Sequence, residues 1–459
     1  MTGVSSPGRR VASALVAANQ SIPRDVINSA RLHLLDAVGV GVVAGKRGPV
    51  AGVNQIALSE TSGVSSVLGR SEPASVAMAA LINGTLIHSL EFDDTHVALV
   101  MHGSSVLAST AIAIAESEGT TVESLVSAFA TGWEFLIRIG LASPGRIQAN
   151  GFQITSAGGA FASAAISCLL SQDSTDVMSN AIGIAGSQAA GTFAFLAEGN
   201  TVKAVQPGWA AHAGILAAEL ARSGVTGPSD VFRGKYGFYS LYARDDSGGD
   251  RLLKSIQDLG TRWYLPEAAF KLIPSCHYIH PFVEAVERAV ASGLNWTQME
   301  NLHAWIPAEV TAIIADPWES RVRPNKSHDA RWSLPYVLAA VLIDGPIGVE
   351  LFTGECRSDV MQLAERMTFE PWANSGYPER YPARIQITDR EKRIQEFTVL
   401  DVKGGAGRPI ESVEVISKAQ LNLHDAGWSD ERVERFIHVL LHESDTPIGE
   451  FSSLLRANN

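Results

Sequence analysis

The sequence has few cysteines, and the three that it has lie far apart. Cys168, Cys276 and Cys356 are odd in number and form no C-x-x-C pair. This pattern indicates neither a disulfide framework nor a zinc knuckle. We therefore expect a soluble, cytoplasmic protein that works in a reducing compartment.

Runs of positive charge and long apolar runs are also missing. The chain has 36 basic and 48 acidic residues, so its formal net charge is 36 − 48 = −12. Such a chain is a poor partner for nucleic acid or an anionic membrane, although a local cationic pocket for an anionic metabolite remains open. Apolar stretches such as 157–170 are short and interrupted by Gly and Ser, so no membrane span is predicted. The glycines at 151–159 form neither G-x-G-x-x-G nor G-K-[ST], which argues against a nucleotide site.

The length of 459 residues and the hydrophobic content of 46% allow a large core and more than one domain. Helical patterns dominate up to about residue 248 and return from 409 to 455. Between them, 301–314 is rich in β-type residues, and 384–388 and 394–399 alternate as a hairpin does. We predict a mainly α protein with helical parts at 1–264 and 404–459 and an inserted α+β domain at 265–403.

The first helical stretch opens at Ser21–Pro23 and carries an apolar stripe that includes Val26 and Leu34. His33 and Asp36 lie off this stripe, so we interpret them as surface or interface residues. A buried helix is predicted at 74–90, and Gly84 permits close packing within it. A capping box at Thr120 and Glu123 precedes a predicted helix at 122–141. Two further helices are predicted at 180–196 and 209–222, with a turn at 198–200 and a break at Pro207–Gly208 between them.

Acidic and imidazole side chains gather between residues 91 and 102. The segment contains Glu91, Asp93, Asp94, Thr95, His96 and His102, and a Ser-opened, Ala-rich helix follows it. Carboxylates and imidazoles are the usual groups for proton transfer near neutral pH, and a helix start favours an anionic ligand. The alternative is a solvated acidic loop between two helices. We interpret the preceding His88 as a packed or supporting histidine.

A second cluster lies where the helical part meets the mixed part, and it contains Lys271, Cys276, His277 and His280. Domain junctions are common places for small-molecule clefts. The spacing His277-x-x-His280 matches no common zinc pattern, so no metal site is predicted. Lys203, beside a turn, has the ordinary interpretation of a solvated surface charge.

Several segments together resemble the MmgE/PrpD family, which includes 2-methylcitrate dehydratases, cis-aconitate decarboxylases and iminodisuccinate epimerases. They are NGTLIHSLEFDDT at 83–95 with His102 beyond it, TVKAVQPGWAAHAGILAAELA at 201–221, KLIPSCHYIHPFVEA at 271–285, HDARWSLPYVLAAVLIDG at 328–345 and DVKGGAGRPIE at 401–411. The resemblance implies one large all-helical domain made from both chain ends and a smaller α+β lid inserted into it. It also implies a homodimer and an active site between the two domains that needs no metal or organic cofactor.

The resemblance also implies roles for individual residues. Glu91 stands where the family commonly has an aspartate, Thr95 matches a hydroxyl group, and His102 and Lys203 match an active-site histidine and lysine. Cys276, His277 or His280 fills the place of a further active-site histidine, and His280 fits best. We predict catalytic roles for Glu91, His102, Lys203 and His280, and binding of a small anionic carboxylate by Asp93, Thr95, Gln153, Lys271, Cys276 and His277.

Gln153 departs from the family pattern, because decarboxylases and epimerases of this type often carry a histidine there. A glutamine donates and accepts hydrogen bonds but transfers no proton near neutral pH. We therefore predict a dehydratase of a citrate-like hydroxy acid, of the 2-methylcitrate type, with His102 as base, Lys203 as anion clamp and His280 as acid. The alternatives are a cis-aconitate decarboxylase, a dicarboxylate epimerase and a non-catalytic carboxylate-binding relative.

Overall fold

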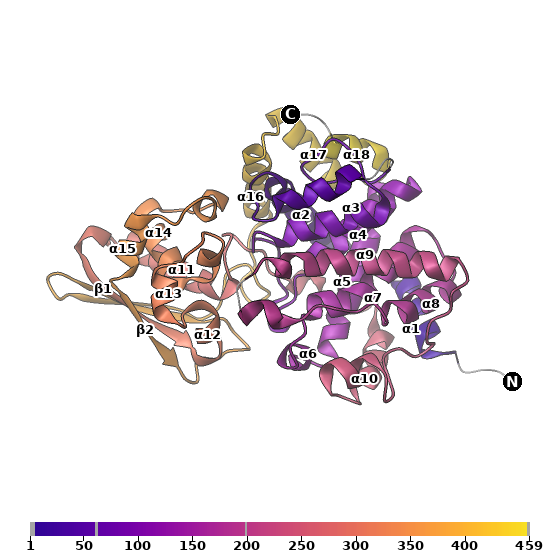
Figure 1. The fold of residues 1–459 in the computed structure, drawn as a ribbon, viewed down its shortest axis with the longest axis horizontal. Coiled ribbons are helices and arrows are strands. Elements are labelled where there is room, and N and C mark those ends of the chain that lie inside the picture. The colour runs from indigo at the N-terminus through magenta and orange to yellow at the C-terminus, as the bar shows by residue number, and fades with distance from the viewer. Residues whose placement is uncertain (1–4, 60–62, 198–199, 457–459) are drawn as a thin grey trace. The chain divides into compact units, whose positions relative to one another are not determined.

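A computed structural model describes residues 5–59, 63–197 and 200–456 of the chain (Figure 1). It divides into two compact units. Unit 1 comprises Met1–Ser89, Asp93–Phe270 and Glu411–Asn459, and unit 2 comprises Leu90–Phe92 and Lys271–Ile410. Unit 1 is helical and unit 2 is mixed, so the predicted fold class, mainly α with a small inserted α+β domain, is confirmed. The turn expected at 198–200 falls partly outside the described residues.

Unit 1 is built from helices of both ends of the chain. The long α2 (Arg24–Arg47), near the N-terminus, packs against α16 (Ser412–Asp425), near the C-terminus. The other helices of the unit are α1 (Pro7–Asn19), α3 (Val76–His88), α4 (Gly103–Glu118), α5 (Val122–Leu141), α6 (Arg146–Ala149), α7 (Ile154–Leu170), α8 (Thr175–Ala185), α9 (Val202–Arg222), α10 (Gly248–Ser255), α17 (Asp430–His442) and α18 (Ile448–Arg456).

The α2 helix is buried on nearly all sides over its second half. Its apolar residues from Leu34 to Ala44 leave no solvent-facing stripe, and a helix that is apolar all round lies inside a protein. His33 and Asp36 are accordingly 0% and 1% exposed. The interpretation of these two residues as surface groups is wrong, because it assumed a single apolar stripe.

Close helix packing organises the centre of unit 1. The α9 helix packs against α3 and α7, and α4 also contacts α3 and α7. Where α3 meets α9, a Cβ atom on Gly84 would lie 2.7 Å from the Cα atom of Gly208 and 2.8 Å from the carbonyl oxygen of Ser105. Only glycine allows two backbones to approach this closely, so the prediction of close packing at Gly84 is confirmed.

Some helix boundaries differ from the predictions. Thr121, and not Thr120, caps α5 by accepting a hydrogen bond from the N–H of Ser124. The α9 helix begins at Val202 and contains Pro207, because the missing N–H of a proline near a helix start removes one bond without ending the helix. The predicted helix at 180–196 is divided into the end of α8 and a short 3₁₀ helix at Phe193–Ala197.

Unit 2 contains a four-stranded sheet in the order β2-β1-β3-β4. Its strands are β1 (Met299–Pro307), β2 (Met367–Trp372), β3 (Ala383–Asp389) and β4 (Ile394–Val399), and its helices are α11 (His280–Ala291), α12 (Thr311–Ile314), α13 (Trp318–Val322), α14 (Leu334–Asp344) and α15 (Ser358–Ala364). The predicted hairpin is formed by β3 and β4, which are antiparallel, whereas β2 pairs parallel to β1. The short α15 ends at Ala364, and β2 begins at Met367.

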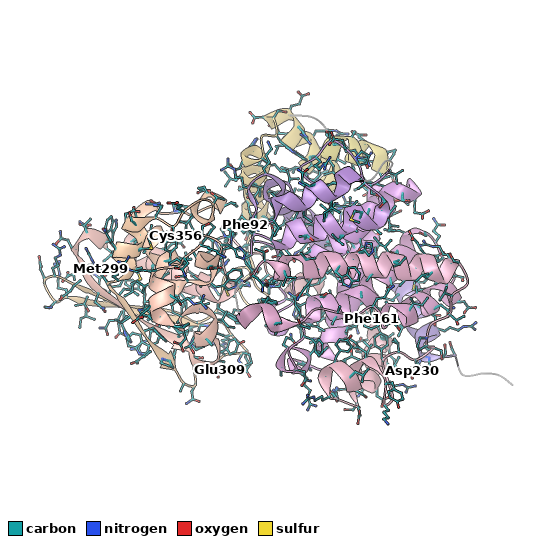
Figure 2. All side chains as sticks on the ribbon, in the orientation of Figure 1. Phe92, Phe161, Asp230, Met299, Glu309 and Cys356 are labelled. Atoms are coloured by element: carbon teal, nitrogen blue, oxygen red, sulfur yellow. The ribbon has the colours of Figure 1, made fainter. Side chains whose placement is uncertain are left out.

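One face of this sheet forms the core of unit 2. Ile385 and Ile387 on β3 alternate with more exposed residues, and α11 contacts both β3 and β4 while α14 packs against α11. Met299, at the start of β1, belongs to the same core. Phe282, on α11, belongs to this core as well, and His280 is the first residue of the same helix. Figure 2 shows Met299 and Cys356 in unit 2 and Phe161 among the helices of unit 1.

Two helices of unit 1, α2 and α5, are long and apolar enough to cross a membrane by composition. Of their most apolar windows, 78% and 83% lie buried inside the structure. This burial is typical of core helices in a soluble protein, which have the same composition.

Candidate active site

The two adjacent aspartates of the 91–102 segment each bind a buried histidine. Asp93 Oδ2 lies 2.7 Å from His88 Nδ1, at the end of α3, and Asp94 Oδ2 lies 2.6 Å from His33 Nδ1, on α2. All four side chains are at most 1% exposed. The alternative of a solvated acidic loop is therefore wrong, and a carboxylate pair held inside the protein takes its place.

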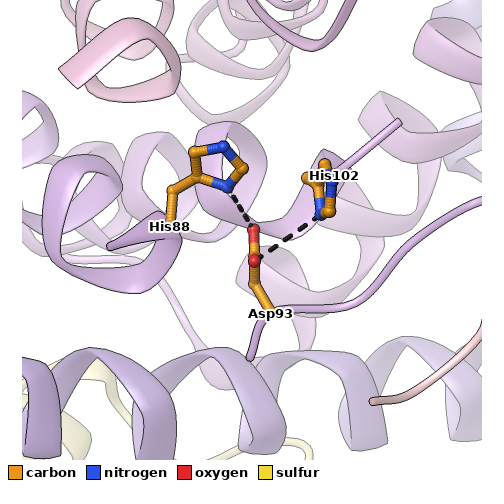
Figure 3. Close-up of side chains that lie close together, drawn as sticks. All are labelled: His88, Asp93 and His102. Atoms are coloured by element: carbon orange, nitrogen blue, oxygen red, sulfur yellow. Dashed lines mark hydrogen bonds and ion pairs between the residues drawn. The ribbon is translucent and has the colours of Figure 1, made fainter. Parts of the chain in front are cut away.

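His102, the N-cap residue of α4, lies next to this pair (Figure 3). Its Nδ1 atom is 2.9 Å from the carbonyl oxygen of Asp94, 3.3 Å from Thr95 Oγ1 and 3.6 Å from Asp93 Oδ1. The side chain of Asp93 thus lies between His88 and His102, as Figure 3 shows. Thr95 and His102 were each predicted as site residues, and the structure brings them together.

His88, Asp93 and His102 also place one nitrogen or oxygen atom each within 4.8 Å of one another. Such a group has the donor types of a metal site. Two of these atoms, however, already share the hydrogen bond between His88 and Asp93. The third contact is the ion pair between Asp93 Oδ1 and His102 Nδ1 at 3.6 Å, so Asp93 joins the two histidines through one hydrogen bond and one ion pair.

Gln153 contacts His88. It is the N-cap residue of α7, it is 4% exposed, and its Nε2 atom lies 3.4 Å from His88 Nε2. The glutamine at the position where relatives often have histidine is therefore held inside the protein, against the histidine that supports Asp93.

Three helices begin close to this group. The backbone N–H of His102, at the start of α4, donates to Thr155 Oγ1 in the first turn of α7 over 3.0 Å, and Ser156 Oγ of α7 donates to the carbonyl oxygen of Gln206 in α9 over 2.8 Å. Asp94 caps α4 through the N–H of Ser104. The N-cap residues of α7 and α9, Gln153 and Thr201, make no side-chain capping hydrogen bond, and N–H groups at a helix start favour an anion.

Lys203 lies in the first turn of α9 and is partly exposed. The sequence pattern predicted a position in a turn before a helix break, whereas Lys203 is the second residue of α9. Both the ammonium group and the N-terminus of the helix carry positive charge. The start of α9 is therefore suited to a carboxylate.

His96 is a further buried histidine of the same segment. It is 3% exposed, and burial lowers its pKa to about 4. It is thus neutral at pH 7, and its backbone pairs with Met101 to close the loop that carries His102.

Unit 2 holds Glu91 in a buried cluster of its own. Lys271 Nζ donates to the carbonyl oxygen of Glu91 over 3.1 Å and lies 3.4 Å from its Oε2 atom. Glu91 has φ of 53°, a left-handed conformation that is uncommon for residues other than glycine and that is found at functional sites. The structure thus brings together two residues, Glu91 and Lys271, that sequence analysis took from separate segments.

Sequence analysis missed Arg331 in this cluster. It is 0% exposed, donates to the carbonyl oxygens of Leu90 and Pro274, and lies over the ring of Phe352. Burial lowers its pKa to about 9, although the nearby charge of Glu91 acts in the opposite direction. An arginine directly before the largely apolar segment WSLPYVLAAVL at 332–342 was the available signal.

Cys276, His277 and His280 lie together at the start of α11. Cys276 precedes the short 3₁₀ helix His277–Ile279, and His280 is the first residue of α11. The rings of His277 and His280 are 4.8 Å apart, and the ring of Tyr381 is 5.9 Å from that of His277. All three predicted residues are buried, and the choice of His280 among them remains a prediction.

Comparison with known protein families identifies two matching ranges in the chain. A family model described as "MmgE/PrpD N-terminal domain" matches residues 12–248, and a second, described as "MmgE/PrpD C-terminal domain", matches residues 273–443. The chain belongs to the MmgE/PrpD family. The family assignment predicted from the sequence is therefore confirmed. The first matched range lies in the helical unit 1, and the second covers most of unit 2 and continues into α16 and α17 of unit 1.

Several characterised members of the MmgE/PrpD family are similar over most of the chain. A cis-aconitate decarboxylase-like protein, oryM, of Aspergillus oryzae is 30% identical, with 95% of this chain and 94% of that protein aligned. A cis-aconitate decarboxylase of Aspergillus terreus is 28% identical over 76% of this chain and 75% of its own length. The human cis-aconitate decarboxylase is 28% identical over 75% of this chain and 71% of its own length.

Proposed function

We propose that this MmgE/PrpD protein is a lyase of small tricarboxylates, and that it decarboxylates cis-aconitate or a close analogue. The names of the relatives put this reaction ahead of the dehydration predicted from the sequence. The observation that carries the proposal is the position of His102, whose Nδ1 atom is engaged by the carbonyl oxygen of Asp94 and by Thr95 Oγ1. The N-cap side chains of α7 and α9 make no capping hydrogen bond.

The proposed reaction balances without an added oxidant or reductant. A C–C bond to one carboxylate breaks and carbon dioxide leaves. The electron pair moves through the neighbouring double bond, and the vinyl carbon at its far end takes up a proton. Nε2 of His102 supplies that proton, and the nearby charge of Asp93 stabilises the protonated imidazole before transfer.

Charge stabilisation is the second requirement. The substrate is a polyanion, and its electron-rich intermediate is stabilised by fixed positive charge and N–H dipoles. Lys203 and the start of α9 would hold one carboxylate. In unit 2 we keep Glu91 and His280 as proposed acid–base groups, and Lys271 as the group that orients Glu91.

Dehydration of a citrate-like hydroxy acid is the second candidate. The observation in its favour is Gln153, which contacts His88 and carries no transferable proton where decarboxylase relatives often have a histidine. In this reaction Nε2 of His102 would remove the proton next to a carboxylate, and a second group would protonate the departing hydroxyl.

Proton NMR in deuterated buffer separates the two candidates. The protein is incubated with cis-aconitate, citrate and 2-methylcitrate in separate tubes. An itaconate-like product carrying one new deuterium supports decarboxylation, and vinyl signals from a hydroxy acid support dehydration. Binding of all three without exchange or product would contradict both reactions and leave a carboxylate-binding protein.

Replacement of Lys203 tests the anion site. We expect Lys203→Ala to abolish turnover while thermal unfolding stays unchanged, because the side chain is partly exposed at a helix start. Lys254→Ala, at an exposed position on α10, is the matched control and should keep full activity. A fully active Lys203→Ala protein would remove Lys203 from the mechanism.

A further inference from the structure

The buried contacts around Asp93 form a chain of two hydrogen bonds and one ion-pair contact. Gln153 Nε2 lies 3.4 Å from His88 Nε2, and His88 Nδ1 lies 2.7 Å from Asp93 Oδ2. Asp93 Oδ1, on the other side of that carboxylate, lies 3.6 Å from His102 Nδ1. His88, Asp93 and Gln153 are at most 4% exposed, so water competes little for these contacts.

The direction of each bond follows from the atoms. An amide nitrogen only donates, so the His88 Nε2 atom that it faces must accept and carries no proton. The single proton of neutral His88 is then on Nδ1, where it donates to Asp93. A backbone carbonyl only accepts, so His102 Nδ1, which is 2.9 Å from the carbonyl oxygen of Asp94, carries a proton. Nε2 of His102 is left as the atom that exchanges protons.

We propose that His88 is a positioning residue that links Gln153 to His102 by holding the Asp93 carboxylate ionised and turned toward His102. This inference rests on the proposed role of His102 in proton transfer. It gives Gln153 a task other than the substrate contact predicted from the sequence. The glutamine orients His88, and a histidine at position 153 could do the same with its own ring N–H.

Asp93 would then serve His102 as a fixed negative charge. When Nε2 of His102 takes up a proton, the imidazolium forms inside the protein. A nearby ionised carboxylate stabilises this positive charge more strongly there than it would in water. Without the His88 N–H, Asp93 loses its short hydrogen bond and the bond energy that favours its charged form. The carboxylate would then rotate or take up a proton, and His102 would lose its partner.

The first test reads the protons directly in the ligand-free protein. Histidine is labelled with ¹⁵N, and long-range ¹H–¹⁵N spectra report which ring nitrogen is protonated. His88→Asn and His102→Asn proteins assign the two signals among the 12 histidines of the chain. We expect His88 and His102 both to carry a single proton on Nδ1 at neutral pH. A proton on Nε2 of His88, alone or in addition to Nδ1, would overturn the proposal.

The second test compares two replacements of His88. Asparagine keeps an N–H donor near the Nδ1 position, whereas leucine removes it. We expect His88→Leu to lower kcat by about 10- to 100-fold, the usual worth of one hydrogen bond to a charged group, with KM changed less than about twofold. His88→Asn should retain most of kcat because the bond to Asp93 is kept. Equal losses in kcat for both variants would refute a positioning role.

The NMR test and the kinetic test can each fail without the other. The NMR measurement needs no substrate, so it decides the hydrogen-bond chain even if no tricarboxylate is turned over and the proposed function is wrong. It also uses the unsubstituted protein, so it decides the chain if His88→Leu does not fold. Normal turnover with His88 protonated on Nε2 would keep the function and remove the positioning role.

Discussion

Replacement of Lys418 should make the stability of unit 1 depend on pH up to neutral values. Lys418, on α16, and Asp36, on α2, form a buried ion pair in which Nζ lies 2.7 Å from Oδ1. Burial nevertheless raises the pKa of Asp36 to about 6, since the cost of removing the carboxylate from water exceeds the attraction of Lys418, and the charge of Asp94 adds to the rise. Burial likewise lowers the pKa of Lys418.

The sign of the effect follows from proton binding. Between its usual pKa of 3.8 and about 6, Asp36 holds a proton in the folded protein but not in the unfolded chain. Stability therefore falls as pH rises through this window, at about 1.4 kcal/mol per unit, or about 3 kcal/mol over about 2 units. Above about pH 6 the group is ionised in both states, and its contribution becomes constant.

Lys418→Met removes the positive charge whose attraction limits the rise in the pKa of Asp36. The pKa of Asp36 in the folded protein should then lie above 7, so the loss of stability continues to neutral pH. From 3.8 to 7 it amounts to about 4 kcal/mol. The added replacement Asp36→Asn removes the titrating group and should abolish the dependence, because a buried pair can be replaced by neutral residues at little cost.

Urea unfolding followed by tryptophan fluorescence measures the effect at pH 5, 6, 7 and 8. We expect the midpoint of Lys418→Met, relative to that of the parent protein, to fall steadily between pH 6 and 8. The midpoint of the double variant, relative to the parent, should not fall in this range. A difference between Lys418→Met and parent that is constant above pH 6 would refute the reasoning, because Asp36 would then ionise normally without Lys418.

Three further predictions concern the site and the packing around it. His102→Gln should lower turnover by about 100- to 10,000-fold in the NMR assay with unchanged thermal unfolding, and wild-type turnover would contradict its role. Gly84→Ala should lower stability by about 1–3 kcal/mol because its Cβ atom would meet Gly208, whereas Gly449→Ala, which meets nothing within 4 Å, should be neutral in the same thermal melt. Thr121→Ala should cost about 1 kcal/mol because Thr121 caps α5, while a larger loss with Thr120→Ala would show that the cap is assigned to the wrong residue.

Local patterns were sufficient for much of the fold. The hairpin of β3 and β4 was predicted from alternation around the charged turn, and its strands begin and end within a residue or so of the expected positions. The parallel strand β2 was missed because its pairing with β1 is a contact that short-range periodicity does not contain. The start of α9 was misplaced because Pro207 was taken as a break.

The site was predictable in composition but not in its internal connections. Glu91, Asp93, Thr95 and His102 were identified from residue types and from the family resemblance. The partners of Asp94 and Glu91, which are His33 and Lys271, lie far away in the sequence. His33 was predicted to be a surface or interface residue because it lies off the single apolar stripe assumed for this helix. Only the apolar character of α2 all round its axis would have indicated burial.

The division of the chain has a consequence for protein engineering. Unit 2 includes Leu90–Phe92, which are separated in the sequence from Lys271–Ile410. An expressed fragment of residues 271–410 would therefore lack the carboxylate and carbonyl oxygens that Lys271 and Arg331 use. Two buried cations would lose acceptors, so we expect the fragment to be unstable alone. A fusion that restores a Leu-Glu-Phe segment through a linker is the minimal design for producing unit 2 as a separate protein.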